Sequence, residues 1–255
     1  MTETNITTLT RFGDAPYFVF CDHASNALPQ DMNCLGMPED MLNTHIAWDI
    51  GSGSVADSLA RKLGATLFRC EFSRLLIDVN RALTAPDLIP AVSDKIPVPG
   101  NQMISEADKA ARIEAYHAPY HERLEGALQE MLSKHDHPFI ISIHSFTHRL
   151  MGGQEDRPWQ IGFLWREDEA NARAMMEFLE QQSGWRIGDN EPYDAREFNY
   201  SVDRHIGPRN LSHVTIEVRQ DIISDNHGIE VVADHLANGA LAVTSENIAP
   251  HKREE

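Results

Sequence analysis

Short apolar runs alternate with segments of helical periodicity along most of the chain. The runs are rich in aliphatic and aromatic side chains, which is typical of strands buried on both faces of a sheet. They cover residues 16–21, 65–70, 75–79, 139–143, 161–165 and 214–218. Between them, helical spacing of apolar residues predicts helices over residues 44–63, 105–134, 167–182 and 226–245. This alternation predicts an α/β fold with a mixed, largely parallel sheet and helices on both faces.

Polar side chains directly follow several of the predicted strands. His23 comes just after the first strand, Asn80 and Arg81 follow the third, and His144 follows the fourth. In open parallel sheets, ligands bind beyond the carboxyl ends of the strands, which meet at one edge. We therefore expect these side chains to converge on a single site.

Two of these residues are candidate metal ligands. Neutral imidazole is the commonest zinc ligand in proteins, and a catalytic zinc has three protein ligands and one water. His23 and His144 are candidates for two of the three. Asp49 is the preferred third ligand, because His45 and Asp49 are four residues apart and would share one side of the predicted helix. Alternatively, Asp49 only stabilises a helix start. Asn26 is a poorer ligand, because a neutral amide binds zinc weakly.

A carboxylate interrupts the last predicted strand. Alternation puts Glu217 on the face opposite Val218 and the other apolar residues of that strand. Burying a carboxylate is costly unless it is paired or functional. Glu217 can act as a general base on a metal-bound water and then protonate a leaving amine. The alternative is a structural ion pair with Arg219 or another arginine.

Arginine residues flank the predicted strand at residues 75–79. Arg74 precedes it and Arg81 follows it. A guanidinium group can bind a carboxylate through two hydrogen bonds or stabilise a developing oxyanion, although surface arginines without a role are common. Asp78 can orient one of the two.

Two further features have weaker interpretations. His117 and His121 are four residues apart, but Pro119 between them should kink or break the helix at residues 105–134, so packing or hydrogen bonding is favoured over a second metal site. The proline-rich segment 86–103 predicts a loop that either covers the site or is a plain surface excursion.

Composition narrows the class of protein. A length of 255 residues with 42% hydrophobic residues fits one folded domain over residues 1–255. A formal net charge of −17 argues against a nucleic-acid partner. No run approaches the roughly 18 apolar residues of a membrane span, and the first residues do not resemble a signal peptide. Three cysteines without CxxC spacing argue against a disulfide framework, and a cytoplasmic location is expected.

Several longer motifs occur in order between residues 18 and 223. They are CDHASNALP, HIAWDIGSG, FSRLLIDVNR, YHAPYHERL, IHSF and IEVRQDI. Together they resemble the N-formylglutamate amidohydrolase family, which looks related to zinc carboxypeptidases and to aspartoacylase-like deacylases. The resemblance implies a zinc-carboxypeptidase-like (phosphorylase/hydrolase-like) α/β fold and one catalytic Zn²⁺.

The resemblance also implies roles for single residues. His23 and His144 match the zinc-binding histidines of the relatives, and Glu217 resembles their general base. Arg74 lies where the deacylases have an arginine that polarises the carbonyl. The pair Asn80–Arg81 resembles the pair that grips the substrate carboxylate. The segment NYSVDRHIG resembles a pocket segment, which implies that His205 binds substrate.

The chain departs from its relatives at one ligand. They carry a His-x-x-Glu motif, whereas this chain has Asn26 three residues after His23. The acidic ligand must therefore come from elsewhere, which is a second reason for choosing Asp49.

These observations predict a zinc-dependent amidohydrolase that cleaves the N-acyl (N-formyl) amide of a small amino acid such as N-formylglutamate. Zinc-activated water attacks the carbonyl and Glu217 serves as the base. The alternatives are another N-acyl amino-acid deacylase, a zinc carboxypeptidase, or an inactive carboxylate-binding protein. A serine hydrolase is disfavoured, because Ser25 and Ser145 lack a Gly-x-Ser-x-Gly elbow. The expected partner is a small-molecule substrate, with no nucleic acid and no membrane, and homo-oligomerisation is left open.

Overall fold

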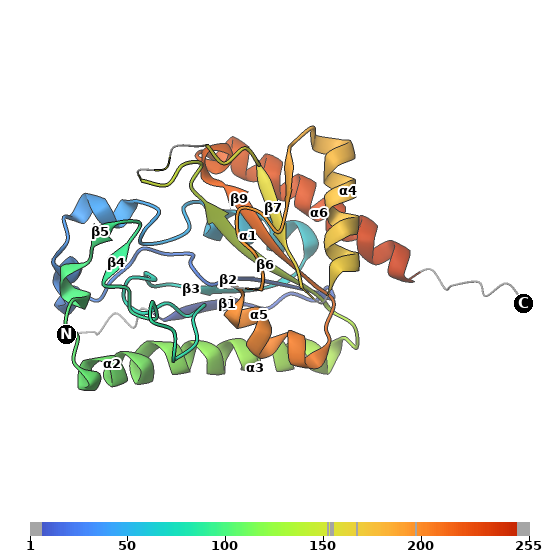
Figure 1. The fold of residues 1–255 in the computed structure, drawn as a ribbon. Helices are drawn as coiled ribbons and strands as arrows, with labels where there is room; N and C mark the ends of the chain where they lie inside the picture. The colour runs from blue at the N-terminus through green and yellow to red at the C-terminus, as the bar shows by residue number, and fades with distance from the viewer. Residues whose placement is uncertain (1–6, 152, 154–155, 167, 197, 249–255) are drawn as a thin grey trace, which may run out of the picture.

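A mixed sheet forms the centre of the fold (Figure 1). The computed structural model describes residues 7–248, except residues 152, 154, 155, 167 and 197. Within this part of the chain, seven strands form one sheet in the order β1-β3-β2-β6-β9-β7-β8. Their bounds are β1 Thr8–Arg11, β2 Tyr17–Cys21, β3 Thr66–Cys70, β6 Phe139–Phe146, β7 Ile161–Leu164, β8 Ile187–Asp189 and β9 His213–Arg219. A separate hairpin joins β4 (Val92–Ser93) to β5 (Ile96–Pro97).

The four central strands run in the same direction. Strands β3, β2, β6 and β9 are parallel neighbours, whereas β1 is antiparallel to β3 at one edge. On the other side, β7 is antiparallel to β9, and β8 is parallel to β7. The predicted mixed, largely parallel sheet is thus confirmed, and the carboxyl ends of β2, β6 and β9 meet at one edge.

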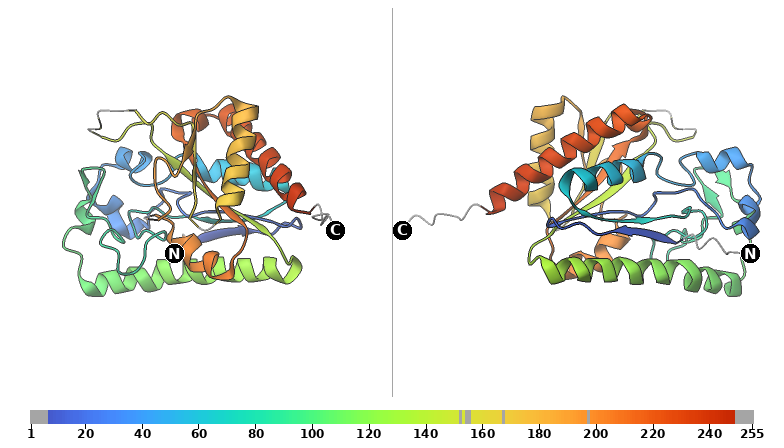
Figure 2. Two further views of the ribbon diagram at one scale, coloured as in Figure 1. Left: turned by 45° about the vertical axis from the view of Figure 1, so that its right-hand side comes forward. Right: turned by 180° about the vertical axis from the view of Figure 1, so that it is seen from behind.

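Helices cover both faces of the sheet. Helices α1, α4 and α6 lie on one face and α3 and α5 on the other, and the rear view in Figure 2 shows α6 running along α1. Both faces are therefore buried, as the apolar runs predict. The bounds are α1 Ser52–Leu63, α2 Glu106–Arg112, α3 Ala118–Lys134, α4 Glu169–Ser183, α5 Tyr200–His205 and α6 Asn226–Ile248.

Strand β2 shows how the two faces are filled. Phe18 and Phe20 pack in the apolar cluster beneath α3, together with Leu124. Val19 and Cys21 alternate with them and pack in the cluster beneath α1 and α6. Burying a valine or phenylalanine side chain completely stabilises the fold by about 1.5–3 kcal/mol. The strand is therefore held firmly where its carboxyl end meets the polar residues.

The predicted helix over residues 105–134 is one helical path with an interruption. Ser105 caps its start, because the amide of Asp108 donates to Ser105 Oγ at 3.0 Å. A π-turn, η4 (Ile113–His117), then joins α2 to α3. Pro119 follows in the first turn of α3, where its missing N–H group would leave a regular helix one hydrogen bond short. The kink or break expected at Pro119 therefore takes the form of a widened turn just before it, and the helical path continues.

The predicted strand at residues 75–79 is wrong. Leu75, Leu76, Ile77 and Val79 are buried as expected, but the backbone turns instead of extending. The amide of Leu76 donates to Ser73 O at 3.0 Å, which is a turn contact. A short apolar run indicates burial, and here a buried loop satisfies that pattern as well as a strand would.

The predicted helix start at residue 44 is also wrong. Residues 44–51 form turns, and α1 begins only after Gly51, whose φ of 81° is left-handed. His45 and Asp49 therefore do not share a helix face. His45 Nε2 lies 2.8 Å from a carboxylate oxygen of Asp94, whereas Asp49 lies at the sheet edge among the other candidate ligands.

The segment 86–103 is a loop, as predicted, and carries the β4–β5 hairpin. Within the described residues, none of the helices is long and apolar enough to cross a membrane.

Candidate active site

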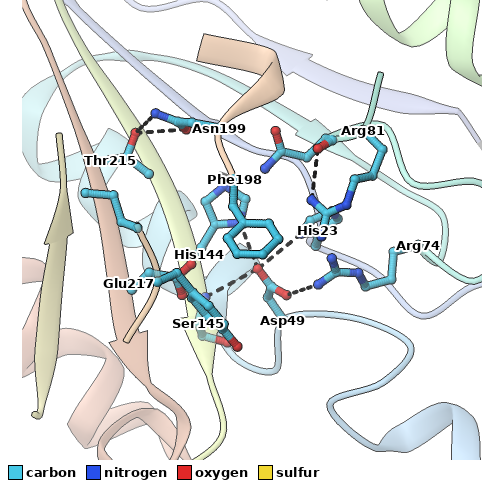
Figure 3. Close-up of a pocket in the computed structure, with 13 residues that line it drawn as sticks. His23, Asp49, Arg74, Arg81, His144, Ser145, Phe198, Asn199, Thr215 and Glu217 are labelled. Atoms are coloured by element: carbon cyan, nitrogen blue, oxygen red, sulfur yellow. Dashed lines mark hydrogen bonds and ion pairs between the residues drawn. The ribbon is translucent and has the colours of Figure 1, made fainter. Parts of the chain in front are cut away.

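Three candidate ligands meet at the carboxyl edge of the sheet (Figure 3). His23 lies just after β2, His144 lies near the end of β6, and Asp49 lies in the turn before α1. One nitrogen or oxygen atom from each lies within 4.8 Å of the other two, and all three residues are buried. Asp49 Oδ2 is 2.9 Å from His144 Nδ1 and 3.3 Å from His23 Nδ1. The structure thus brings together the three residues that the sequence suggests as metal ligands.

Two further aspartates, Asp78 and Asp22, lie behind the two histidines. His23 Nε2 is 2.7 Å from Asp78 Oδ1, and His144 Nε2 is 3.6 Å from Asp22 Oδ2. An outer carboxylate favours a proton on Nε2 and so directs the lone pair of Nδ1 towards the centre of the site. Two such nitrogens with one carboxylate are a donor set suited to catalytic zinc. The residues present therefore fit a zinc ion.

The electrostatics of the cluster favour a cation at its centre. Burial works to lower the pKa of His144, but its contacts with Asp22 and Asp49 hold that pKa well above the ordinary value. Burial alone would raise the pKa of Asp49, yet the neighbouring rings of His23 and His144 lower it. Both shifts mean that the carboxylates attract positive charge, which protons supply here and a metal ion can replace.

Main-chain hydrogen bonds connect the loops that carry these residues. The amide of Asp49 donates to His23 O at 3.0 Å. The amide of Ser73 donates to Ala27 O at 2.8 Å, and the amide of Arg74 donates to Ala47 O at 3.1 Å. The loops after β2, before α1 and around Arg74 are thus bound to one another as well as to the sheet.

Glu217 lies beside the candidate ligands. It pairs in register with His144 across the parallel strands β6 and β9. Its side chain is buried, and its Oε2 atom has no hydrogen-bond partner within the described part of the chain. Burial is the main cause that raises the pKa of Glu217 to about 7, and Asp49 adds to the shift. A carboxyl group that exchanges its proton near neutral pH is suited to general base catalysis.

The alternative interpretation of Glu217 as the partner of Arg219 does not agree with the geometry. Arg219 Nε donates to Asp221 Oδ1 at 2.7 Å, and its Nη1 donates to the carbonyls of Arg157 and Trp159. Glu217 therefore faces the cavity without this arginine.

Arg74 reaches the same edge from the opposite side. Its Nε and Nη2 atoms donate to Asp78 Oδ2 at 3.0 and 2.7 Å, and its Nη1 donates to Asp49 Oδ1 at 3.4 Å. Asp78 therefore orients Arg74, as the sequence suggested, and also contacts His23. The buried carboxylate of Asp78 thus contacts both His23, a candidate metal ligand, and Arg74, the candidate for polarising the substrate carbonyl.

Asn80 and Arg81 line another part of the cavity. The amide of Ser201 donates to Asn80 Oδ1 at 3.0 Å, which leaves the NH₂ group of Asn80 as the donor for a ligand. Arg81 Nε donates to Asp87 Oδ2 at 2.7 Å, and the guanidinium lies 5.1 Å from the centre of the Phe198 ring. Both residues line the cavity, although they follow a loop and not a strand.

Two histidines, His117 at the end of η4 and His121 in α3, hold the backbone on both sides of Asn80. His117 Nε2 donates to Arg81 O and His121 Nε2 donates to Val79 O, each at 3.0 Å. The favoured interpretation of this pair, hydrogen bonding within the fold, thus agrees with the structure. Burial lowers the pKa of His121 to about 3, so this ring is neutral.

His205 lies next to these histidines and outside the cavity. Its Nε2 is 2.9 Å from His121 Nδ1, and its Nδ1 is 2.9 Å from Glu125 Oε2. The resemblance implied a substrate-binding role for His205, but the structure places it behind the Asn80–Arg81 pair, where it can act only through other residues.

The cavity between these groups has a volume of about 220 Å³. Several of its lining residues were not suggested by the sequence. They come from β6, β7, β9 and the loop before α5 without any local pattern: Ser145, Leu164, Tyr193, Phe198, Asn199 and Thr215.

Comparisons with known proteins agree with this architecture. The model of the family "N-formylglutamate amidohydrolase" matches residues 15–224. The crystal structure of a gene product from Agrobacterium tumefaciens is 31% identical, with a TM-score of 0.89 over 94% of this chain and 96% of that one. The structure of N-formylglutamate amidohydrolase from Ralstonia eutropha JMP134 is 19% identical, with a TM-score of 0.72 over 94% of this chain and 98% of that one. A search of curated proteins gave no match.

Proposed function

The chain belongs to the N-formylglutamate amidohydrolase family, a hydrolase family that acts on amide bonds, and we propose that it is a zinc-dependent enzyme that removes the acyl group from a small N-acyl amino acid. The formyl group is the simplest acyl group, and N-formylglutamate is the substrate in the family's name. The proposal rests on one observation: His23, Asp49 and His144 form a buried donor set directly beside Glu217, whose Oε2 atom has no hydrogen-bond partner in the described part of the chain.

Zinc fits the donor set for the reasons given above, and His23, Asp49 and His144 would hold it. When bound, the metal would lower the pKa of a water molecule and polarise the acyl carbonyl. The hydrogen bond with Asp78 would keep the His23 imidazole in the tautomer that offers Nδ1, and the Asp22 carboxylate lies 3.6 Å from His144 Nε2 on the corresponding side.

Glu217 is the general base of the proposed reaction. Its Oε2 atom has no hydrogen-bond partner among the described residues, so it is available to accept a proton from the attacking water. The same carboxyl group then donates that proton to the nitrogen of the leaving amino acid. A pKa of about 7 for Glu217 suits both steps, because the group releases and accepts protons near neutral pH.

Arg74 stabilises negative charge that develops on the carbonyl oxygen. Its contacts with Asp78 and Asp49 fix the guanidinium at the edge of the cavity before any substrate arrives. A fixed positive charge loses little energy to reorganisation when the oxyanion forms.

Asn80 and Arg81 bind the carboxylate of the amino-acid half. A guanidinium and an amide NH₂ offer several donors to one carboxylate, and so orient the acyl carbonyl towards His23 and His144. The hydrogen bonds from His117 and His121 to the flanking carbonyls keep this clamp in place.

The test combines metal analysis with an assay for formate. The purified protein is expected to contain zinc and to release formate from N-formyl amino acids, to lose activity on dialysis against a chelator, and to regain it with Zn²⁺. His144→Gln should lose both zinc and activity. His45→Gln is the matched control, because His45 pairs with Asp94 away from the cavity. Full activity in metal-free protein would refute the proposal.

A further inference from the structure

The charged side chains around the cavity limit the kind of amino acid that the site accepts. Among the described residues that line it, the only arginines are Arg74 and Arg81, and there is no lysine. N-acyl glutamate carries two carboxylates, so it needs two cationic positions if both are to be buried. The question is whether both arginines are available.

Arg74 already pairs with two carboxylates of the protein. Three of its nitrogen atoms donate to the carboxylates of Asp49 and Asp78, and both of these aspartates are buried. Turning Arg74 to a substrate carboxylate would remove the arginine partner of both aspartates, which is unfavourable inside the protein. Arg74 therefore does not supply a carboxylate subsite.

Arg81 can exchange its partner. Its contact with Asp87 is at the surface, where the Asp87 side chain is 51% exposed. An exposed ion pair of this kind contributes little to stability, so a substrate carboxylate can replace Asp87 at low cost. The cavity thus offers one position for one carboxylate.

Away from the candidate metal ligands, the remaining described residues of the cavity wall carry no positive charge. Leu164, Tyr193 and Phe198 present apolar or aromatic surface. Asn199 and Thr215 hydrogen-bond to each other, at 3.2 and 3.3 Å, and neither side chain carries a charge (Figure 3).

Two neighbours of this wall also disfavour a second carboxylate. Glu217 lies two residues after Thr215 on the same face of β9 and adds negative charge. Arg157 lies behind Tyr193, where its Nη1 donates to Tyr193 Oη at 3.1 Å and to Thr147 O, and it is not a lining residue. A carboxylate buried here would lose its hydration without gaining a cation.

We propose that the site selects N-acyl amino acids with a single carboxylate and an uncharged side chain, in preference to N-acyl glutamate. This inference rests on the proposed function and narrows its substrate class. The α-carboxylate binds Arg81 and Asn80, and the uncharged side chain lies against Leu164, Tyr193, Asn199 and Thr215.

The sharpest test compares N-formyl-L-glutamine with N-formyl-L-glutamate. The two have nearly the same shape and differ by one charge, so size and acyl group are held constant. With zinc-loaded enzyme at pH 8, we expect kcat/KM for the glutamine compound to be higher by about tenfold or more, because an unpaired buried charge costs more than an unpaired neutral group. N-formyl-L-leucine should also exceed the glutamate compound. Equal or higher kcat/KM for N-formylglutamate would overturn the inference but leave the proposed function standing, whereas no formate from any of the three would refute both.

A charge introduced at the cavity mouth provides an independent test. Phe198 is 38% exposed and packs over Arg81, so a polar replacement there should not unfold the protein. Phe198→Arg should supply the missing cation. The ratio of kcat/KM for N-formyl-L-glutamine to kcat/KM for N-formyl-L-glutamate should therefore fall by about tenfold. Phe198→Gln, the uncharged control, should leave the ratio near its original value. An equal change in both variants would show that charge does not set the preference.

Discussion

The substitution Glu217→Gln should make the metal-free protein more stable and the enzyme inactive. Glu217 is buried next to Asp49, and its Oε2 atom has no partner among the described residues. Ionising this group inside the folded protein therefore costs free energy. Glutamine keeps the size of the side chain and removes the charge.

The magnitude follows from the pKa of Glu217. The value is about 7 in the folded protein against an ordinary value of 4.5. At about 1.36 kcal/mol per pKa unit, the ionised group destabilises the fold by on the order of 3 kcal/mol above pH 7. Because the pKa is raised on folding, the folded state holds the proton more tightly, and stability is lost as the pH rises from 4.5 to 7. The variant should gain most at pH 8 and progressively less towards pH 5.

Thermal unfolding in the presence of a chelator measures this difference. For a chain of this size, about 3 kcal/mol corresponds to a rise in Tm of roughly 6–12 °C at pH 8. Glu180→Gln, on the exposed side of α4, is the control and should leave Tm nearly unchanged. Zinc-loaded Glu217→Gln should retain its metal and lose roughly 10²- to 10⁴-fold in kcat.

Two results would refute this reasoning. A Tm at pH 8 that is unchanged or lower would mean that Glu217 is not a strained buried carboxylate. An unchanged kcat would remove Glu217 from the role of general base, even if the stability result agreed.

Three other predictions test the clamp, the histidines and the metal. Arg81→Gln should raise KM for N-formyl amino acids roughly tenfold to a hundredfold with a smaller effect on kcat. Arg173→Gln on α4 is the control variant, and an unchanged KM in Arg81→Gln would exclude Arg81 from carboxylate binding. Because burial lowers the pKa of His121 to about 3, the fold should lose stability as the pH falls from 6.5 towards 3. Urea unfolding at pH 7 and 4.5 should show a smaller loss of stability for His121→Gln than for the wild type, and an equal loss in both proteins would contradict the prediction. Zinc should raise the Tm of chelated protein, and His144→Gln should abolish that rise; an equal rise in the variant would mean that zinc binds elsewhere.

The sequence predicted that His23, Asp49 and His144 come together as candidate metal ligands, but one of its reasons was wrong. His23 and His144 were identified from their positions after buried strands, and β2 and β6 are indeed adjacent and parallel. Asp49 was chosen because a helix would align it with His45, and no helix exists there. The other reason for choosing it, the absence of an acidic residue at position 26, did not depend on the helix.

The errors in the fold have a common physical cause. A run of buried apolar residues indicates that a segment is inside the protein, and it does not determine whether the backbone extends or turns. Residues 75–79 are buried as a loop because hydrogen bonds such as that from Asp78 N to Leu88 O satisfy the backbone. The edge strands β1 and β8 were not predicted, because short edge strands lack a continuous apolar run.

The cavity wall could not be predicted from local sequence. Tyr193, Phe198 and Asn199 belong to an irregular segment that tertiary contacts bring against β9. His205 shows the opposite case, since a recognisable motif lies close to the site without lining it. Only the three-dimensional packing separates residues that line the cavity from residues that support it.

The main-chain bonds among the loops make the candidate ligands depend on one another. Opening the loop around Arg74 breaks the bonds that the amides of Ser73 and Arg74 donate to Ala27 O and Ala47 O in the two neighbouring loops, so the loops that carry His23 and Asp49 lose support together. The three loops should thus behave as one cooperative unit, in which the amide hydrogens of Asp49, Ser73 and Arg74 exchange with solvent at a common rate. A change in the length of any one loop would then disturb all of them, whereas the strand that carries His144 would stay in place.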